Sequence, residues 1–324
     1  IGMRGDTDCF RFTATKGQII ELEVRAARLG SKLDGVLRVL AADGRELASN
    51  DDGRGKDPYL AFTAPDNGEY IAALTDLNGR GGDGWTYRLR IAPAMPDFSL
   101  TVAPDCLSVG PGDRVPVTVT AARAFGFNDE ITLEGVSLPP GLTLQGPLKL
   151  AAGQNEIQFF AVADANAAPA MVPLRIIGRA GVGARTASAL LEEYTKNPEG
   201  NLVRGTRPVP FPLTGITGAP DVIVSLGAEK LELKVGATAE LLVELTRKAG
   251  FTAKVPLILT GLPAGVSATP LEVPENQSEV KLTFKAEANA AVGEHRVVLV
   301  GRSVVDELRF TPHAAPPLAL QVVK

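Results

Sequence analysis

The sequence predicts an all-β protein built from several sandwich- or barrel-type domains, and three observations lead to this prediction. Short runs of alternating apolar and polar residues recur along all 324 residues, and Asn-Gly and Asp-Gly turn signals separate them. A unit of about 100 residues also occurs twice. At a usual ~150 residues per domain, this length corresponds to two or three domains. Hydrophobic residues at 45% and charged residues at 22% are typical of a globular chain.

The alternation is clearest in four segments: residues 20–24, 115–119, 231–235 and 280–284. A period of two places the apolar side chains on one face, as a half-buried antiparallel strand requires. Turn signals such as Asp43-Gly44 and Asn78-Gly79 supply the positive φ that tight hairpins need. These segments are therefore expected to form strands joined by short turns.

The chain after its first domain contains an internal repeat. Residues 138–142 (Leu-Pro-Pro-Gly-Leu) match 262–266 (Leu-Pro-Ala-Gly-Val), and residues 165–168 match 288–291 as Ala-Asn-Ala-Ala. The offset is nearly constant at about 124 residues, which indicates two copies of one β domain rather than a solenoid. The expected boundaries are 97–218, called repeat 1 here, and 219–324, called repeat 2.

Repeat 1 is longer than repeat 2 near its end, and the extra residues have a helical spacing. The apolar positions stand three, three, one and three residues apart, and Asn197-Pro198 follows them. This spacing predicts a short amphipathic helical insertion near 184–197, which we interpret as a surface insertion. The positions are Ala184, Ala187, Leu190, Leu191 and Tyr194.

Residues 4–91 carry an ordered series of short motifs. They include Gly-Asp-Thr-Asp at 5–8, Leu-Asp-Gly-Val-Leu at 33–37, Asn-Asp-Asp at 50–52 and Gly-Glu-Tyr at 68–70. This series resembles the bacterial pre-peptidase C-terminal (PPC) domain. The resemblance implies a jelly-roll-like β-sandwich over 1–93, in a secreted bacterial protein, as an accessory domain rather than a catalyst. Cys9 departs from the family, which usually has an aromatic residue there.

The two repeats are similar to bacterial immunoglobulin-like domains of planctomycete-type surface proteins. The similarity rests on Leu-Pro-x-Gly, then Ala-Asn-Ala-Ala, then an apolar strand that ends in Gly-Arg. It implies two tandem immunoglobulin-like β-sandwiches. The first residues, Ile-Gly-Met-Arg, lack the regions of a signal peptide and are interpreted as the cut edge of a longer protein. The family resemblances imply that this protein is extracellular or at the bacterial cell surface.

Acidic and amide side chains gather in the loops of the first domain. Ca²⁺ takes six to eight oxygen ligands, so such loops could form a calcium site, and collagen-binding domains similar to the PPC family bind calcium. The alternative is that these residues are ordinary turn formers. Calcium is the one cofactor considered, and its candidate ligands are Asp34, Asn50, Asp51, Asp52, Asp57 and Asp76.

Two aromatic residues are candidates for contacting a ligand. Trp85 and Tyr87 follow a Gly-rich loop and could form a stacking platform for a sugar or a peptide, although aromatic residues usually belong to the core. Cys9 and Cys106 are interpreted as two separate small core residues, with a disulfide between them as the alternative.

Catalytic motifs are missing from the sequence. The two histidines, His295 and His313, have no metal-binding spacing, and His313 is expected in a loop between Pro312 and Ala314. No Gly-x-Ser-x-Gly elbow and no P-loop occur. Net charge is -4, which argues against nucleic acid as the main partner. The sequence contains no run of 18 apolar residues, so no transmembrane helix is predicted.

These observations favour a non-catalytic adhesion or spacer array of a larger secreted or surface protein. Its partners would be an extracellular protein or polysaccharide, together with the flanking domains of the parent protein. The alternative is the accessory region of a secreted protease or other hydrolase whose catalytic domain lies outside this chain. An enzyme within these residues would need a cleft lined by carboxylates with shifted pKa values.

Overall fold

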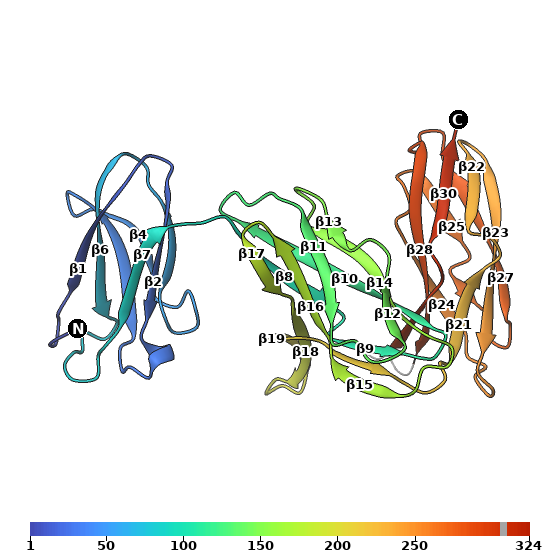
Figure 1. Ribbon diagram of the computed structural model, residues 1–324, viewed down its shortest axis with the longest axis horizontal. Coiled ribbons are helices and arrows are strands. Elements are labelled where there is room, and N and C mark those ends of the chain that lie inside the picture. Colours follow the sequence, from blue (N-terminus) through green and yellow to red (C-terminus); the bar gives the residue numbers. More distant parts are fainter. Residues whose placement is uncertain (305–309) are drawn as a thin grey trace. The chain divides into compact units, whose positions relative to one another are not determined.

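The computed structural model describes residues 1–304 and 310–324, and almost every element in them is a strand (Figure 1). This confirms the all-β fold class, with more than one sheet in each part of the chain. One 3₁₀ turn, η1 (Ala27–Leu29), is the exception in the described part of the chain. Two compact units are present. Unit 1 contains Ile1–Asp97 with Ala124–Phe127, and unit 2 contains Phe98–Arg123 with Asn128–Lys324.

Unit 1 is a sandwich of a four-stranded sheet, β1-β6-β3-β4, and a three-stranded sheet, β5-β2-β7. The strands are β1 (Asp8–Ala14), β2 (Ile19–Arg25), β3 (Gly35–Ala41), β4 (Glu46–Asn50), β5 (Tyr59–Thr63), β6 (Gly68–Asp76) and β7 (Arg88–Pro93). Leu22 and Val24 of β2 are fully buried with Leu37 of β3 and Leu74 of β6. The period of two in β2 therefore places its leucine and valine inward and its glutamates outward.

Repeat 1 contains three sheets, in the orders β12-β14-β10-β8-β18-β19, β13-β11-β16-β17 and β15-β20-β9. Their strands are β8 (Asp97–Ala103), β9 (Cys106–Val109), β10 (Arg114–Ala124), β11 (Ile131–Val136), β12 (Leu142–Gln145), β13 (Lys149–Leu150), β14 (Glu156–Ala163), β15 (Ala170–Pro173), β16 (Arg175–Ala180), β17 (Gly183–Thr186), β18 (Ser188–Lys196), β19 (Leu202–Val209) and β20 (Leu213–Ile216).

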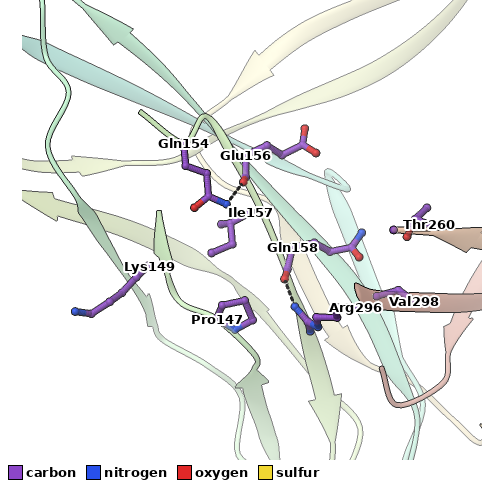
Figure 2. Close-up of a pocket in the computed structure, with 10 residues that line it drawn as sticks. Pro147, Lys149, Gln154, Glu156, Ile157, Gln158, Thr260, Arg296 and Val298 are labelled. Carbon is purple, nitrogen blue, oxygen red and sulfur yellow. Dashed lines mark hydrogen bonds between the residues drawn. The ribbon is translucent and has the colours of Figure 1, made fainter. Parts of the chain in front are cut away.

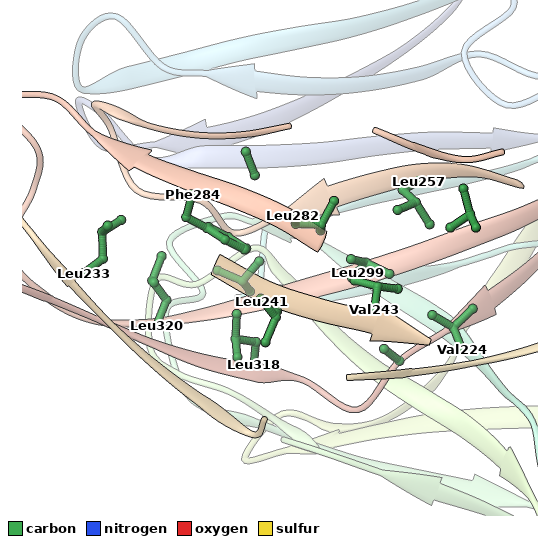
Figure 3. Packing of buried hydrophobic residues seen from close by; sticks show 14 of the residues in the cluster. Val224, Leu233, Leu241, Val243, Leu257, Leu282, Phe284, Leu299, Leu318 and Leu320 are labelled. Carbon is green, nitrogen blue, oxygen red and sulfur yellow. The ribbon is translucent and has the colours of Figure 1, made fainter. Parts of the chain in front are cut away.

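Repeat 2 contains two sheets, β21-β23-β27-β25 and β22-β30-β28-β24-β26, with β29 beside β28. Its strands are β21 (Val222–Leu226), β22 (Lys230–Lys234), β23 (Thr238–Arg247), β24 (Val255–Thr260), β25 (Val266–Thr269), β26 (Glu272–Val273), β27 (Glu279–Ala286), β28 (Gly293–Val304), β29 (Phe310–Ala314) and β30 (Leu318–Val323). Phe284 lies fully buried among leucines of both sheets, such as Leu241 and Leu320 (Figure 3).

The two repeats share one strand order. β8-β10-β14-β12 in repeat 1 has its counterpart in β21-β23-β27-β25 of repeat 2. The β9–β20 pair is parallel, and so is the β22–β30 pair. Each sheet of unit 2 takes its strands from one repeat. The sequence repeat is therefore a repeat of topology.

One arginine occupies the same place in both repeats and clamps the loops at one end of the sandwich. Arg247 donates to the carbonyl oxygens of Ala253 at 2.7 Å, Gln277 at 2.7 Å and Pro274 at 3.2 Å. Arg123 donates in the same way to the carbonyl oxygens of three loop residues: Asp129, Ala151 and Gln154. A planar guanidinium can satisfy several carbonyl groups at once, which explains why an arginine stands at both positions.

The prediction of a helix near 184–197 is wrong, because this segment contains the strands β17 and β18. β18 pairs with β19 over eight residues, and Ser188 and Ala189 continue the sheet beside β8. Ala187 and Ala189 are buried whereas Leu190 is exposed, so the burial has a period of two. Asn197 and Pro198 belong to the hairpin turn, where Gly200 has a φ of 84° and donates to the carbonyl oxygen of Asn197.

Candidate functional site

Three loops at one end of unit 1 enclose a polar pocket of about 560 Å³. They follow β2, β4 and β6, which places their side chains at the same end of the sandwich. Three cations and two carboxylates line the pocket together with apolar and hydroxyl groups. The lining residues are Ala27, Ser31, Lys32, Leu33, Asp34, Asp52, Lys56, Leu77 and Arg80. The pocket therefore offers charges of both signs to a ligand.

Asp76 lies at the end of β6, next to this pocket, and its side chain is fully buried. Its oxygens accept hydrogen bonds from Nε and the backbone N–H of Arg80, and from Nε1 of Trp85. Backbone N–H groups of Asp34 and Asn78 also donate to it. Burial alone would raise the pKa of Asp76, but these donors outweigh burial and hold the pKa far below 3.8.

Asp57 is also fully buried, and it organises the start of η1. Its carboxylate accepts the backbone N–H groups of Ala26 at 3.0 Å and Ala27 at 2.7 Å, and Nε of Arg28 at 2.6 Å. Burial opposes the charged form, yet the hydrogen bonds from Arg28 and the backbone lower the pKa of Asp57. Asp57 is therefore an anion that the fold itself has neutralised.

The predicted calcium ligands divide into two groups. In the first group, Asp57 and Asp76 bind arginines and backbone N–H groups. Oδ1 of Asn50, also in this group, accepts a hydrogen bond from the backbone N–H of Tyr59 at 3.0 Å. The remaining residues are Asp34 and Asp52, which line the pocket, and Asp51, which is exposed. Within residues 1–304 and 310–324, no group of three or more His, Cys, Asp or Glu side chains could hold a metal ion. Calcium binding at these loops stays a prediction.

Trp85 and Tyr87 are half-buried, and both pack against the core of unit 1. Besides its bond to Asp76, Trp85 lies under Lys32, whose Nζ is 5.3 Å from the ring centroid. The hydroxyl of Tyr87 donates to Oδ2 of Asp8 at 2.6 Å. Burial and this acidic neighbour raise the pKa of Tyr87. The two rings also line a pocket of about 410 Å³, so contact with a ligand stays a prediction.

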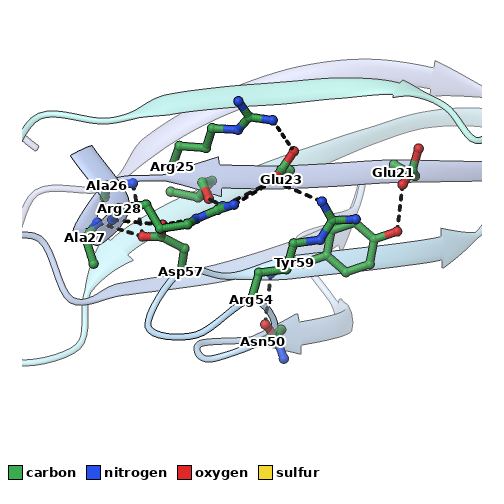
Figure 4. A network of polar contacts seen from close by, with 11 residues as sticks. Glu21, Glu23, Arg25, Ala26, Ala27, Arg28, Asn50, Arg54, Asp57 and Tyr59 are labelled. Atoms are coloured by element: carbon green, nitrogen blue, oxygen red, sulfur yellow. Dashed lines mark hydrogen bonds and ion pairs between the residues drawn. The ribbon is translucent and has the colours of Figure 1, made fainter. Parts of the chain in front are cut away.

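A cluster of arginines covers the outer face of the β5-β2-β7 sheet (Figure 4). Glu23, on β2, is bound by three guanidinium groups: Arg25 at 3.2 Å, Arg28 at 3.1 Å and Arg54 at 3.1 Å. The guanidinium of Arg54 also stacks on the ring of Tyr59, 4.1 Å from its centroid. Burial would raise the pKa of Glu23, but the arginines lower it overall. No local pattern in the sequence indicates this cluster, because its members come from separate segments of the chain.

A second pocket, of about 440 Å³, lies in unit 2 between the two repeats (Figure 2). Repeat 2 contributes Arg296, whose Nη1 donates to the carbonyl oxygen of Gln158 in repeat 1 at 3.2 Å. The guanidinium also lies 5.5 Å from the ring centroid of Phe160, and burial lowers the pKa of Arg296. These contacts, together with the apolar group of Phe160, Val298, Val300 and Ala314, join the repeats.

A buried Ser-His-Asp arrangement also joins the repeats. Nε2 of His313 shares a hydrogen bond with Oγ of Ser303 at 2.9 Å, and Nδ1 of His313 lies 2.6 Å from Oδ2 of Asp113. Each of the three residues is 1% exposed. Burial raises the pKa of Asp113, and the hydrogen bond from His313 partly offsets this. The expectation that His313 lies in a loop is wrong, because it belongs to β29.

The geometry of these three side chains matches a hydrolytic triad, but their burial does not. A nucleophilic serine must reach a substrate, and the hydroxyl of Ser303 is sealed between two packed domains. Asp113 belongs to repeat 1 and His313 to repeat 2, so the hydrogen bond between them closes the joint. The arrangement serves to join the repeats.

Both cysteines are free and exposed, so the interpretation as core residues is wrong. Cys9 stands on β1, where alternation turns it outward, and Cys106 opens β9. Each stands at the surface of a different unit.

Comparison with known proteins identifies the first part of the chain. Residues 6–75 match the family model of the bacterial pre-peptidase C-terminal domain. This confirms the resemblance of unit 1 to the PPC domain. A curated relative, a probable subtilase-type serine protease of Deinococcus radiodurans, is 36% identical over 78 residues. That match covers 24% of this chain and 11% of the protease.

Solved structures similar to the chain include domains of an S-layer protein and of intimin. Domains 5 and 6 of the S-layer protein SbsC match with a TM-score of 0.28 and 11% identity, over 71% of this chain and 100% of that one. The D0–D1 domain of intimin has a TM-score of 0.24 and 11% identity, covering 69% and 97%. The similarity to planctomycete-type repeats stays a prediction. No helix in the described residues is long and apolar enough to cross a membrane.

Proposed function

We propose that this chain is a non-catalytic extracellular module array of a larger protein. Unit 1 would provide the binding surface, and the two repeats would provide a stiff spacer. The observation that carries the proposal is the contrast between buried and exposed chemistry. Asp57, Asp76 and the Ser303–His313 pair are buried and occupied by partners within the fold. Exposed charges line the three-loop pocket of unit 1 and the outer face of its β5-β2-β7 sheet.

The alternative is the accessory region of a secreted protease, and one observation favours it. The matched relative of the PPC domain is a probable subtilase-type protease, and only 11% of that protein is matched. A catalytic domain in the parent protein of this chain would then cleave the polymer or protein that unit 1 binds. Both versions agree that the residues described here bind and do not react.

Retention and turnover can be measured on the same preparation. The full chain would be passed over immobilised collagen, peptidoglycan, neutral dextran and acidic polysaccharides, and assayed against casein and p-nitrophenyl acetate. We expect retention on at least one matrix and no turnover. Hydrolysis that disappears in Ser303→Ala would overturn the non-catalytic assignment. Failure to bind any matrix would overturn the binding role.

A further inference from the structure

Five arginines form the outer surface of the β5-β2-β7 sheet, and they are called the arginine face here: Arg25, Arg28, Arg54, Arg88 and Arg90. The strand register brings Arg25, Arg88 and Arg90 together, whereas Arg28 of η1 and Arg54 of the β4–β5 loop reach this face through their ion pairs with Glu23. Arg25 is the cross-strand partner of Arg88, and Glu23 lies between Tyr59 on β5 and Arg90 on β7. Alternate residues of β2 and β7 are apolar and point into the core. The outer face of the sheet, which faces the solvent, therefore carries the arginines.

The charges on this face lie in two layers. The side chains of Arg25, Arg28 and Arg54 are 54%, 41% and 45% exposed, whereas that of Glu23 beneath them is 5% exposed. Arg90 and Glu21 repeat the arrangement at 53% and 15%. Unit 1 contains nearly equal numbers of basic and acidic residues, yet the layer that solvent meets here is cationic. An overall charge count therefore hides this surface.

The pair Arg25 and Arg88 is a second and independent sign of an anionic ligand. Like charges directly opposite each other on neighbouring strands destabilise a sheet. Arg25 shares Glu23 with two other arginines, and Arg88 has no anionic partner among the residues that the structure describes. An anion bound between the two guanidinium groups would remove the repulsion and fill donors that are left open.

We propose that the arginine face docks an anionic polysaccharide, whose carboxylate or sulfate groups bind between the exposed guanidinium groups. This inference rests on the proposed binding role of unit 1 and names its class of partner. Guanidinium forks suit anions that offer two oxygens, as carboxylate and sulfate groups do, and a row of guanidinium groups on a sheet face suits a stiff extended chain that repeats one anionic group. A flexible acidic peptide would lose more conformational entropy in lying flat, and a peptide strand would instead dock at a sheet edge.

Nucleic acid fits this face less well. Proteins that bind single strands stack bases on exposed aromatic rings. Tyr59 is the aromatic residue of the arginine face, and the guanidinium of Arg54 already covers its ring. The hydroxyl of Tyr59 is also engaged, because it donates to Glu21 at 2.7 Å. The face therefore offers charge and hydrogen-bond donors but no open stacking surface.

The experiment measures binding of the full chain to immobilised polygalacturonate and dextran sulfate, with neutral dextran, poly-L-glutamate and a single-stranded oligonucleotide beside them. Arg88→Gln removes no side-chain contact, and Arg25→Gln/Arg88→Gln empties the cross-strand pair. Arg11→Gln is the matched control, since Arg11 is an exposed arginine on the other sheet. Unchanged thermal unfolding of each variant shows that it is folded.

We expect binding to both acidic polysaccharides, weaker binding as salt rises, and a dissociation constant about tenfold higher for each arginine removed. Arg11→Gln should bind like the unmodified chain. Equal binding of the double variant, or equally tight binding of neutral dextran, poly-L-glutamate or the oligonucleotide, would overturn the inference. If the chain binds collagen, peptidoglycan or neutral dextran but no acidic polysaccharide, the inference fails while the proposed binding role stands.

Discussion

Two carboxylates in unit 1 resemble ligand-binding residues, but they stabilise the fold. Asp57 stands in a loop and Asp76 ends β6, and each is next in sequence to a residue that lines the three-loop pocket, where a ligand-binding acid would be expected. Each is buried and fully engaged by N–H donors, and each therefore has a lowered pKa. Their charged forms stabilise the fold above the ordinary carboxyl pKa of 3.8, and this contribution is lost as the pH falls below it.

Replacing Asp57 by asparagine tests whether the residue stabilises the fold or holds calcium. Asp57→Asn removes the anion beside Arg28 and leaves a backbone donor of η1 unsatisfied, so the free energy of unfolding should fall by about 1–3 kcal/mol. Calorimetry should give the same loss in millimolar Ca²⁺ and in excess chelator. Asp66→Asn, an exposed carboxylate paired with Lys16, should change stability by less than about 0.5 kcal/mol. A loss seen only with Ca²⁺ present would make Asp57 a calcium ligand.

The sequence shows that acidic residues gather in the loops of unit 1, but it does not show which partners they contact. Acidic turn residues are visible as a pattern, and Asp34 and Asp52 do line one pocket. Their partners are not visible, because Arg28 and Asp57 meet across 29 residues and no local spacing signals the pair. No local spacing signals the arginine face either, since its members come from separate strands and loops that meet only in the folded sheet.

At the scale of elements, a period of two predicted strands wherever one sheet face is buried. The helical spacing of the apolar positions at residues 184–197 was misleading, because this segment forms the strands β17 and β18. Pairing with β8 and β19 decided the outcome there, because tertiary contacts override a weak local preference. The internal repeat was the most reliable signal, since it reappears as a common strand order.

The arginine clamp should make equal contributions to the two repeats. Arg123→Ala and Arg247→Ala each remove a cation that donates to three loop residues, so each should cost its repeat about 1–3 kcal/mol. Arg247→Lys should recover only part of the loss, because an ammonium cannot span the three carbonyl groups. Denaturant unfolding of the four proteins measures this.

A matched control for the clamp is Lys281→Ala, which breaks an exposed ion pair with Glu240 and should cost less than about 1 kcal/mol. A clamp variant that loses no more than this control would show that the loops hold themselves in place. A loss in one repeat alone would show that the two clamps are not equivalent.

At the scale of the whole molecule, the joint between the repeats of unit 2 is the feature that the sequence indicates least. Asp113 and His313 are 200 residues apart, and neither belongs to a motif. The joint combines an apolar group around Phe160, the Arg296 contact and this buried polar pair. Domains that share a sealed polar contact of this kind should unfold together, since unfolding either repeat removes one partner of the hydrogen bond between Asp113 and His313.

A double-mutant cycle at the joint measures this coupling. Asp113→Ala or His313→Ala alone should cost about 3–5 kcal/mol, because each leaves its partner buried and unpaired. The double variant should cost clearly less than the sum of the two. Calorimetry should also show one transition for both repeats in the unmodified chain and two in the single variants. Additive losses with a single transition throughout would contradict the coupling.

The parallel closure of each repeat has a mechanical consequence. β22 follows β21 near the start of repeat 2, and β30 ends the repeat. β22 and β30 run side by side in the same direction over five residue pairs, from Lys230–Ala319 to Lys234–Val323. Tension applied at the two ends of such a domain pulls these strands past each other lengthwise. All the hydrogen bonds between them then carry the load together, whereas a hairpin pulled open from its end would lose them one at a time. β9 and β20 close repeat 1 in the same way, so both domains are built to resist stretching along the chain.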